Sequence, residues 1–419
     1  MIPSFAQHQR LVGGRHVHAL SNTVAIGLRL VGALNVDALS RAVAELLRRH
    51  EALRMVFPGD DSVELHTDGA PLWTIEADDP SRALEILVRN ASRPFDLARG
   101  PLFRVTLVRV APTLHLLGLE LDHQITDGWS NRVLVQDLLH LYSAFAADEA
   151  PPPPPAALRF ASFAEQERSR NFDRQVHYWR KQLAGISLVP DSGLRDRPGS
   201  PGVGEVSVTV DAAPIVDFAR SHGVSPVPVI TAAVQAVTWK RRLSWMRPDE
   251  AADVAIISWL ANRIAPLVDH TVGYFATRTV LRTDLSGDPG FAEVVDRASR
   301  TLWGALRHQR VPHAALLRLL EPGRYGSIYD GAAPAFLELN VSSGMQLPRM
   351  PGLLVEQVEV PLVRVPAGGL KVSGLLAGGE LVLRMAYREE LFSSEWCEGF
   401  LGDVRGYVVA GVQDPAVCL

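Results

Sequence analysis

The chain has 419 residues, of which 47% are hydrophobic and 21% charged, and its formal net charge is -4. This length and composition predict a large core divided between two lobes, and no basic block indicates a nucleic-acid or membrane partner. The first residues do not resemble a signal peptide, and no apolar run reaches the roughly 18 residues of a membrane span. The two cysteines, Cys397 and Cys418, predict no disulfide framework, so we expect a cytoplasmic protein.

Helical and strand patterns alternate along the chain, which predicts a mixed α/β fold. Asn35 can cap a helix that runs to about His50 and carries one apolar face. A buried strand is expected over residues 114–121, with Asp122 and His123 at its end. The other expected elements are a helix over 131–147, strands over 206–210, 253–258 and 380–387, and helices over 227–239, 291–309 and 393–412.

Two stretches are predicted to be loops. Residues 151–155 are five prolines, which neither a helix nor a central strand accommodates. Such a run is either a ligand for a partner protein or, the interpretation we prefer, a stiff spacer that carries the chain across a surface. Residues 191–204 are rich in Gly, Pro, Ser and Arg and predict a second loop.

The candidate for chemistry is His123, which lies four residues before Asp127, with Gly128 next. This spacing on a helix can bind a metal, but no third ligand is spaced nearby, so no metal site is expected. Two interpretations stay open from these residues alone. His123 is either a structural histidine at a strand end or a group that accepts a proton during a reaction, as a neutral imidazole can.

The stretch Asp122-His123-Gln124-Ile125-Thr126-Asp127-Gly128 resembles the His-His-x-x-x-Asp-Gly signature of condensation domains of nonribosomal peptide synthetases. Trp129 and Ser130 continue the resemblance. Stretches similar to the family's other motifs follow in the same order along nearly the whole chain: residues 4–11, 49–54, 94–104, 178–185, 272–275 and 308–312. The sequence is thus similar to a free-standing condensation domain, and this ordered set favours a chemical role for His123.

The resemblance implies two chloramphenicol-acetyltransferase-like lobes in a V-shaped pseudo-dimer, with a tunnel between them. Residues 1–178 are expected to form the lobe with the histidine motif, and residues 179–419 the lobe with a floor loop and a latch. The implied activity is acyl transfer from the phosphopantetheine thioester of a carrier protein to an amine or alcohol, giving an amide or ester in natural-product (antibiotic) biosynthesis. No cofactor bound by the protein itself is implied. Because no adenylation or carrier motif is present, we expect a monomer that acts in trans on peptidyl or acyl carrier proteins, with a free or carrier-bound acceptor.

The resemblance also implies roles for single residues. His123 is expected to be the general base or the group that positions the nucleophile. Asp127 is expected to hold the His123 loop in shape by pairing with an arginine, for which Arg54 is the best match. Gly128 either allows a tight backbone turn or donates its N–H to the developing oxyanion. Residues assigned to the tunnel by location alone, each with a structural role as the alternative, are Trp129, Trp259, Asn262, Thr277, Asn340, Ser342 and Ser343.

The sequence departs from the family pattern at two places. Asp122 replaces the first histidine of the signature, for which the family implies a mainly structural role. Asp122 can stabilise a protonated His123 only if the two side chains approach each other. Successive residues on a strand face opposite ways, which argues against that approach. Thr277 and Arg278 stand where the family has Asn-Thr, so the local hydrogen bonds or the acceptor pocket are expected to differ.

Three functions are alternatives to acyl transfer. The first is a catalytically silent condensation-like module that recruits carrier proteins or tailoring enzymes, which Asp122 favours and the retained His123 and Asp127 disfavour. The second is an epimerisation domain, which shares the signature but has an acidic partner motif that is not evident here. The third is heterocyclisation, which is disfavoured because that class replaces the catalytic histidine by aspartate.

Overall fold

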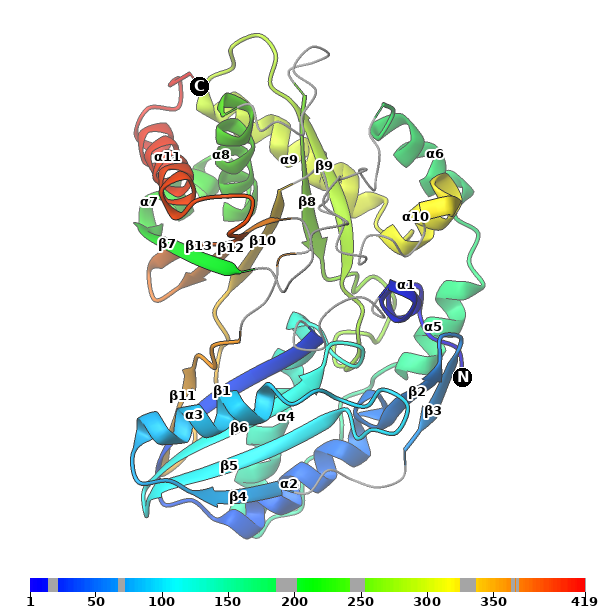
Figure 1. Cartoon of the computed structure of the whole chain (residues 1–419), viewed down its shortest axis with the longest axis vertical. Helices are drawn as coiled ribbons and strands as arrows, with labels where there is room; N and C mark the ends of the chain where they lie inside the picture. The colour runs from blue at the N-terminus through cyan, green and yellow to red at the C-terminus, as the bar shows by residue number, and fades with distance from the viewer. Residues whose placement is uncertain are drawn as a thin grey trace. The chain divides into compact units, whose positions relative to one another are not determined.

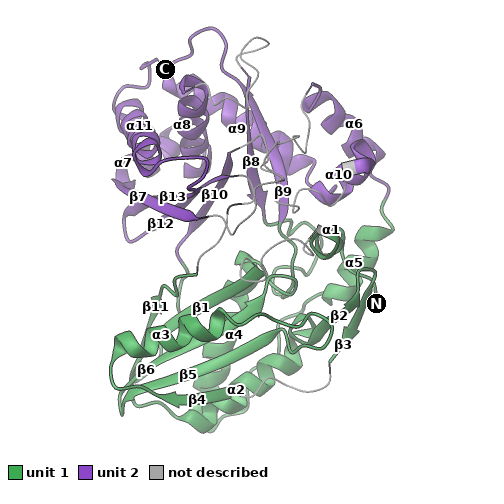
Figure 2. Ribbon diagram, viewed as in Figure 1, with its two compact units in different colours: residues 1–170, 261–276, 345–363 green, residues 171–260, 277–344, 364–419 purple. Residues whose placement is uncertain are grey.

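The computed structural model describes residues 1–13, 22–66, 72–185, 202–241, 253–324, 337–362, 366 and 369–418. It contains two compact units, shown in green and purple in Figure 2. Unit 1 comprises residues 1–170, 261–276 and 345–363, and unit 2 comprises residues 171–260, 277–344 and 364–419. Two segments of the second half of the chain therefore belong to unit 1. The division into lobes at residues 178 and 179 stays a prediction.

Unit 1 is built on a five-stranded sheet in the order β11-β1-β6-β5-β4. Strand β1 pairs antiparallel with β6 on one side and with β11 on the other, whereas β4 is parallel to β5. A small hairpin, β2-β3, is separate from this sheet. The bounds are β1 (Thr23–Gly32), β2 (Met55–Gly59), β3 (Ser62–Leu65), β4 (Leu72–Glu76), β5 (Phe103–Ala111), β6 (Leu114–Asp122) and β11 (Leu353–Val358).

Helices cover both faces of this sheet (Figure 1). On one face α2 packs beside α4, and their apolar sides form the main core of the unit with strand residues such as Leu117. On the other face α3 covers a smaller cluster that includes Leu116. Strand β6 is buried on both faces, and its side chains are apolar except for His115, Glu120 and the final Asp122. The bounds are α1 (Phe5–Gly13), α2 (Val36–Arg49), η3 (Glu51–Arg54), α3 (Pro80–Ala91), α4 (Gly128–Ala146) and α5 (Phe160–Arg168).

Unit 2 is built on a six-stranded sheet in the order β7-β13-β12-β10-β8-β9. Strand β10 is parallel to both of its neighbours, and the other pairs are antiparallel. The bounds are β7 (Val203–Asp211), β8 (Asp253–Leu260), β9 (Thr277–Asp284), β10 (Glu338–Ser343), β12 (Leu370–Ala377) and β13 (Glu380–Arg388).

The helices of unit 2 centre on α8, which contacts α9, α11 and β8 and is buried along most of its length. An apolar helix with so weak an amphipathic pattern is stable only in such a site, between other helices and a sheet. The bounds are α6 (Asp173–Gln182), α7 (Ala212–Ser221), α8 (Pro226–Lys240), α9 (Phe291–Arg307), α10 (His313–Leu320), η4 (Pro322–Arg324) and α11 (Ser394–Gln413).

The predicted mixed α/β class is confirmed, and each predicted helix and strand is present with shifted ends. Asn35 caps α2 by accepting the N–H of Ala38 at 3.0 Å, as predicted. The largest shifts are at the starts of α4 and β7, which begin at Gly128 and Val203 and not near residues 131 and 206. Residues 151–155 form neither helix nor strand, and most of the predicted loop over 191–204 lies outside the described residues. In the part of the chain that the structure describes, no helix combines the length and apolar character that crossing a bilayer requires.

Candidate functional site

His123 lies in a turn immediately after β6, where the pairing between β6 and β1 ends at Asp122 and Thr23. Its backbone N–H donates to the carbonyl oxygen of Asn22 at 2.7 Å, which fixes the turn to the chain that precedes β1. The turn is closed by the N–H of Ile125, which donates to the Asp122 carbonyl at 3.1 Å. The partly buried His123 ring therefore leaves the sheet at a defined position.

A tyrosine and an arginine stand beside the His123 ring. The Tyr274 ring meets it edge to face, with 5.0 Å between centroids. The Arg10 guanidinium lies 5.0 Å from the centre of the Tyr274 ring and donates to the Tyr274 hydroxyl at 3.4 Å. Arg10 also donates to the Asn22 side chain at 2.5 Å. Arg10 thus contacts both residues that hold His123. These are Tyr274, which packs against the His123 ring, and Asn22, which accepts the His123 backbone N–H.

Asp122 is buried, with 5% of its surface exposed, and its carboxylate accepts the N–H of Gln124 at 2.8 Å. Burial raises the pKa of Asp122 to about 6, while that hydrogen bond and the Arg10 charge act in the opposite direction. The carboxylate is therefore held by the Gln124 N–H and lies in the field of the Arg10 charge. In this position Asp122 shapes the turn that carries His123.

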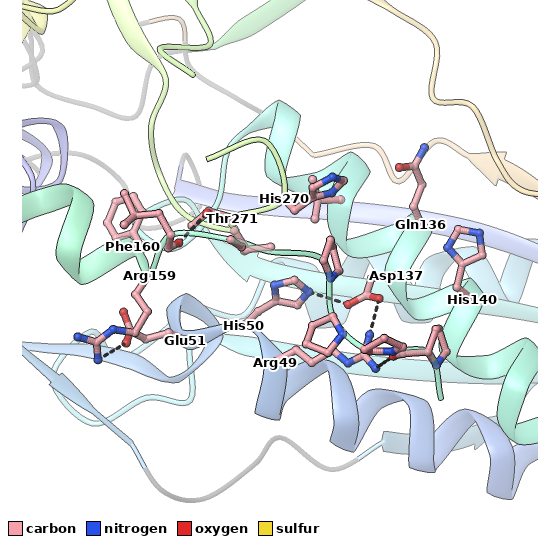
Figure 3. A pocket seen from close by; sticks show the side chains of 18 residues that line it. Arg49, His50, Glu51, Gln136, Asp137, His140, Arg159, Phe160, His270 and Thr271 are labelled. Atoms are coloured by element: carbon pink, nitrogen blue, oxygen red, sulfur yellow. Dashed lines mark hydrogen bonds and ion pairs between the residues drawn. The ribbon is translucent and has the colours of Figure 1, made fainter. Parts of the chain in front are cut away.

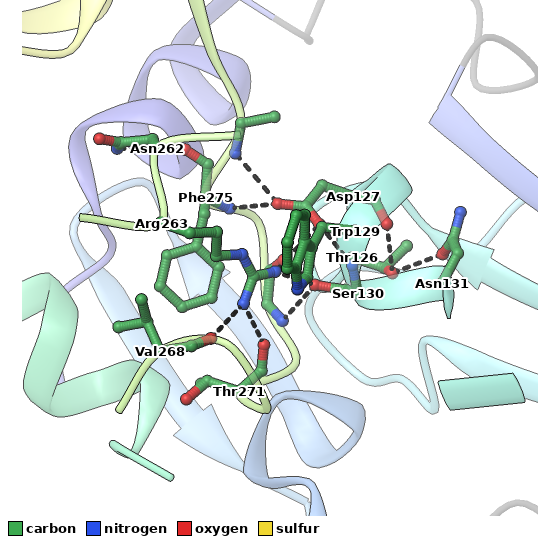
Figure 4. A network of polar contacts seen from close by, with 12 residues as sticks. Thr126, Asp127, Trp129, Ser130, Asn131, Asn262, Arg263, Val268, Thr271 and Phe275 are labelled. Carbon is green, nitrogen blue, oxygen red and sulfur yellow. Dashed lines mark hydrogen bonds and ion pairs between the residues drawn. The ribbon is translucent and has the colours of Figure 1, made fainter. Parts of the chain in front are cut away.

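Asp127 caps the start of α4, and four N–H groups surround its carboxylate (Figure 4). One oxygen accepts the N–H of Ser130 at 2.7 Å and a guanidinium N–H of Arg263 at 3.1 Å. The other oxygen accepts the backbone N–H groups of Phe275 and Ala276 at 3.0 and 3.1 Å. A carboxylate has about four acceptor positions, so Asp127 is saturated. It cannot accept a proton from a substrate without losing a bond of this network.

The prediction that Arg54 pairs with Asp127 is wrong, because the partner is Arg263. Arg54 ends the short helix η3, whereas Arg263 belongs to residues 261–276 of unit 1, which run alongside the start of α4. Arg263 also donates to the carbonyl oxygens of Val268 and Thr271 and to the Ser130 hydroxyl, at 2.5 to 2.7 Å. One guanidinium thus binds the second segment of unit 1 to the helix that follows His123.

Gly128 is the first residue of α4 and is exposed, and its backbone is helical. A Cβ atom at this position would meet no other heavy atom within 4 Å. A tight turn therefore does not require glycine here, which contradicts that interpretation. The absent side chain leaves the end of the helix open, and the N–H groups of Gly128 and Trp129 are among those that no carbonyl within the helix accepts.

The residues assigned to the tunnel fall in both units. In unit 1, the indole N–H of Trp129 donates to the Asp269 carbonyl at 2.9 Å, and the buried Asn262 donates to the Phe275 carbonyl at 3.2 Å. Both side chains therefore join the Asp127 network.

In unit 2, Trp259 donates to Glu338 at 2.7 Å, and the Thr277 hydroxyl accepts the N–H of His313 at 2.9 Å. The remaining three residues lie on β10 and are Asn340, Ser342 and Ser343. A common role in a tunnel stays a prediction for all seven residues.

Unit 1 also holds a hollow of about 280 Å³ beside the proline run (Figure 3). Asp137 of α4 accepts from Arg49 at 3.1 Å and lies 2.9 Å from the ring of His50. Arg49 also donates to the Pro152 carbonyl. The stretch 49–54 thus fixes the proline-rich segment to α4. This attachment agrees with the interpretation of the proline run as a spacer. Within the described ranges, no three His, Cys, Asp or Glu side chains are grouped to hold a metal ion.

Two sheets covered by helices, with the histidine turn at the end of a central strand, define the chloramphenicol-acetyltransferase-like fold. The family model "Condensation domain" matches residues 14–328, and the chain belongs to this family. It is 29% identical over 390 residues to chondramide synthase cmdD of Chondromyces crocatus, a match that covers 88% of this chain and 10% of that protein. The chain thus spans about a tenth of the length of this curated relative.

Two solved structures extend the similarity over the whole chain. The SgcC5 protein from Streptomyces globisporus, in complex with an aryl ethanediol and sucrose, has a TM-score of 0.80 and 25% identity, and all of each chain is covered. The X-domain from teicoplanin biosynthesis, in complex with OxyB, has a TM-score of 0.79 and 25% identity, with 100% of this chain and 94% of that chain covered. The chain is therefore a condensation domain of natural-product biosynthesis.

Sequence reasoning missed three residues of this site: Arg10, Asn22 and Tyr274. Arg10 and Tyr274 lie within stretches whose resemblance to family motifs was noted, at residues 4–11 and 272–275. Their positions in those motifs were the available signal. Nothing in the sequence indicates that the two motifs meet at His123.

Proposed function

We propose that this chain transfers an acyl or aminoacyl group from a carrier-protein thioester to an amine or alcohol, with His123 as the group that accepts the proton. The observation that carries the proposal is the placement of His123. Its backbone is bonded to Asn22 and its ring lies against Tyr274, while the neighbouring Asp127 is saturated and serves as scaffold. An imidazole in a fixed position, next to a carboxylate whose acceptor positions are already occupied, is suited to act as the single acid–base residue.

The proposed reaction balances with one histidine. The N–H or O–H of the acceptor attacks the thioester carbonyl, and the proton passes to His123. The new C–N or C–O bond forms as the C–S bond breaks, and the phosphopantetheine thiolate takes the proton and leaves. Positioned acid–base help of this kind is worth roughly 10²–10⁴ in rate, and alignment of the two substrates supplies much of the rest.

The start of α4 is proposed to stabilise the oxyanion of this reaction. Gly128 leaves open space where a side chain would lie, and the partial positive charge of a helix N-terminus favours a developing negative charge. Asp127 holds this end of the helix rigidly through its four bonds. The donor, under this proposal, is a carrier protein acting in trans, and no cofactor of the chain's own is involved.

The acceptor to be tested first is an alcohol. The SgcC5 structure, which matches this chain over its whole length, holds an aryl ethanediol. An imidazole base serves a hydroxyl as well as an amine, so an amine acceptor is the parallel arm of the assay.

The test is turnover measured by mass spectrometry, with an acyl-loaded carrier protein and an alcohol or amine acceptor. His123→Ala is expected to lower turnover by roughly 10²–10⁴ while the unfolding midpoint is kept. His140→Ala is the matched control, because His140 is an exposed histidine on α4 and should leave turnover unchanged. Full turnover in the His123→Ala protein would reject the proposal.

A second candidate is a silent module that recruits a tailoring enzyme or a carrier protein. It is favoured by the similarity to the X-domain that was solved in complex with OxyB, and by Asp122 in the signature. The wild-type protein would then give no product with any loaded carrier but would bind a tailoring enzyme tightly. Product formation by the wild-type protein excludes this candidate.

A further inference from the structure

One surface of unit 2 exposes a tryptophan between two arginines. Trp303 on α9 is 59% exposed, and together with Arg300, Gly304 and Arg307 it lines a groove. Large aromatic side chains are costly to leave in water, and an exposed Trp next to Arg is typical of the centre of a binding surface. The groove lies within unit 2 and is separate from the His123 site in unit 1.

Packed aromatic rings lie next to Gly304 of this groove. A Cβ atom at Gly304 would come within 2.3 Å of the Tyr178 hydroxyl, so α6 packs against α9 only because position 304 has no side chain. The Tyr178 ring stacks on the His308 ring with 3.7 Å between centroids. Trp303 therefore projects from a rigid base, which lowers the entropy that binding would cost.

Arginines outnumber carboxylates on this part of α9 and in the chain that follows it. From Arg297 to Leu320 the sequence has five arginines and no Asp or Glu, in a chain whose net charge is -4. Arg300 pairs with Asp296 at 3.0 Å, so Asp296 offsets part of this charge. Among the described residues, no carboxylate pairs with Arg307. The complementary partner has an apolar centre with carboxylates around it.

We propose that this Trp303 surface docks the acidic face of the carrier protein that delivers the acyl group; the inference rests on the proposed function. The phosphodiester that joins the phosphopantetheine arm to its carrier adds negative charge next to the docking face. A second copy of the chain fits less well, because a symmetric contact would bring the arginines of one patch against those of the other. Binding is then weakened by salt, as exposed charges are screened.

The test is titration of a fluorescently labelled holo peptidyl carrier protein with the full chain, followed by anisotropy. Trp303→Ala is expected to weaken binding by about tenfold or more, in the range of a central interface aromatic. The double charge reversal Arg300→Glu/Arg307→Glu should weaken it further and remove its salt dependence. Trp73→Ala is the matched control, because Trp73 is 37% exposed and Arg93 lies 5.8 Å from its ring.

The proposal would be overturned if the wild type and both variants bind the carrier protein equally well, or if none of the three binds it. An equal loss in the Trp73→Ala protein, or a wild-type chain that dimerises through this patch, would also overturn it. Turnover with an acyl N-acetylcysteamine thioester separates docking from chemistry, since this donor has no carrier. The Trp303→Ala protein should keep that turnover. If wild type binds the carrier through Trp303 but acylates nothing, the docking surface stands and the proposed function fails.

Discussion

Asp122 and Asp127 lie five residues apart, on either side of the turn that carries His123, and both are buried, at 5% and 1% exposed. Their surroundings differ. Asp127 accepts four N–H groups, one of them from a guanidinium, whereas Asp122 accepts one backbone N–H. Burial raises the pKa of Asp122 to about 6. A buried carboxylate stabilises a fold only where donors replace the water it has lost.

The two aspartates therefore have different structural roles at the turn that carries His123. Asp127 joins two stretches of unit 1, since it binds Ser130 in the first and Arg263 and the backbone at Phe275 in the second. Asp122 shapes only its own turn through Gln124, at an electrostatic cost. Removing the charge should thus have opposite effects at the two positions.

The largest effect is expected for Asp127→Asn. The amide NH₂ would face backbone N–H groups, and Arg263 would lose its buried counter-charge, so the free energy of unfolding should fall by about 3–5 kcal/mol. Urea denaturation measures this loss. Asp79→Asn is the control, since Asp79 caps α3 at an exposed position and asparagine caps a helix about as well as aspartate, so the free energy of unfolding should change little. A loss of the same size at both positions would contradict the saturated network.

Asp122→Asn should stabilise the protein at pH 8. The unfolded carboxyl loses its proton near pH 3.8 and the folded one near pH 6, so the wild type loses stability as the pH rises through this interval. Asparagine keeps an acceptor for the Gln124 N–H without a charge. The advantage of the variant at pH 8 should reach about 3 kcal/mol and shrink toward pH 4. A difference between the two proteins that does not change with pH would show that Asp122 is not desolvated.

The smallest effect on stability is expected for Gly128→Ala, which adds a methyl group directly after the second of the two aspartates. Because the backbone is helical and the space is open, the free energy of unfolding should stay the same or rise by up to about 1 kcal/mol. Turnover should nevertheless fall, since the methyl group narrows the approach to the Gly128 N–H. A variant that is as active as the wild type would remove Gly128 from the proposed oxyanion site.

Sequence reasoning predicted the elements of this fold well where the pattern was local. Asn35 and the apolar face of α2 are read from neighbouring residues, and both are confirmed. The start of α4 was placed three residues late, because the capping of the helix by Asp127 was not recognised. The membership of β11 in the first sheet was not predicted, since its partner β1 lies at the other end of the chain.

The candidate site was predictable up to its first contacts. His123 and its strand end follow from the pattern of residues 114–123. The partner of Asp127 was assigned to Arg54 because an arginine was expected from the family, and spacing does not distinguish one distant arginine from another. Arg263 reaches Asp127 through the path of residues 261–276, which only the three-dimensional structure shows.

The pairing of β1 with β11 has a consequence for the folding of this protein during its synthesis on the ribosome. Gly27 finds its partner Val358 only after almost the entire chain has been synthesised. Until then one edge of the first sheet has open hydrogen-bonding groups, and such an edge invites pairing with other chains. Contacts this distant in sequence also slow folding. We therefore expect the nascent chain to depend on chaperones, and fragments that end before β11 to aggregate.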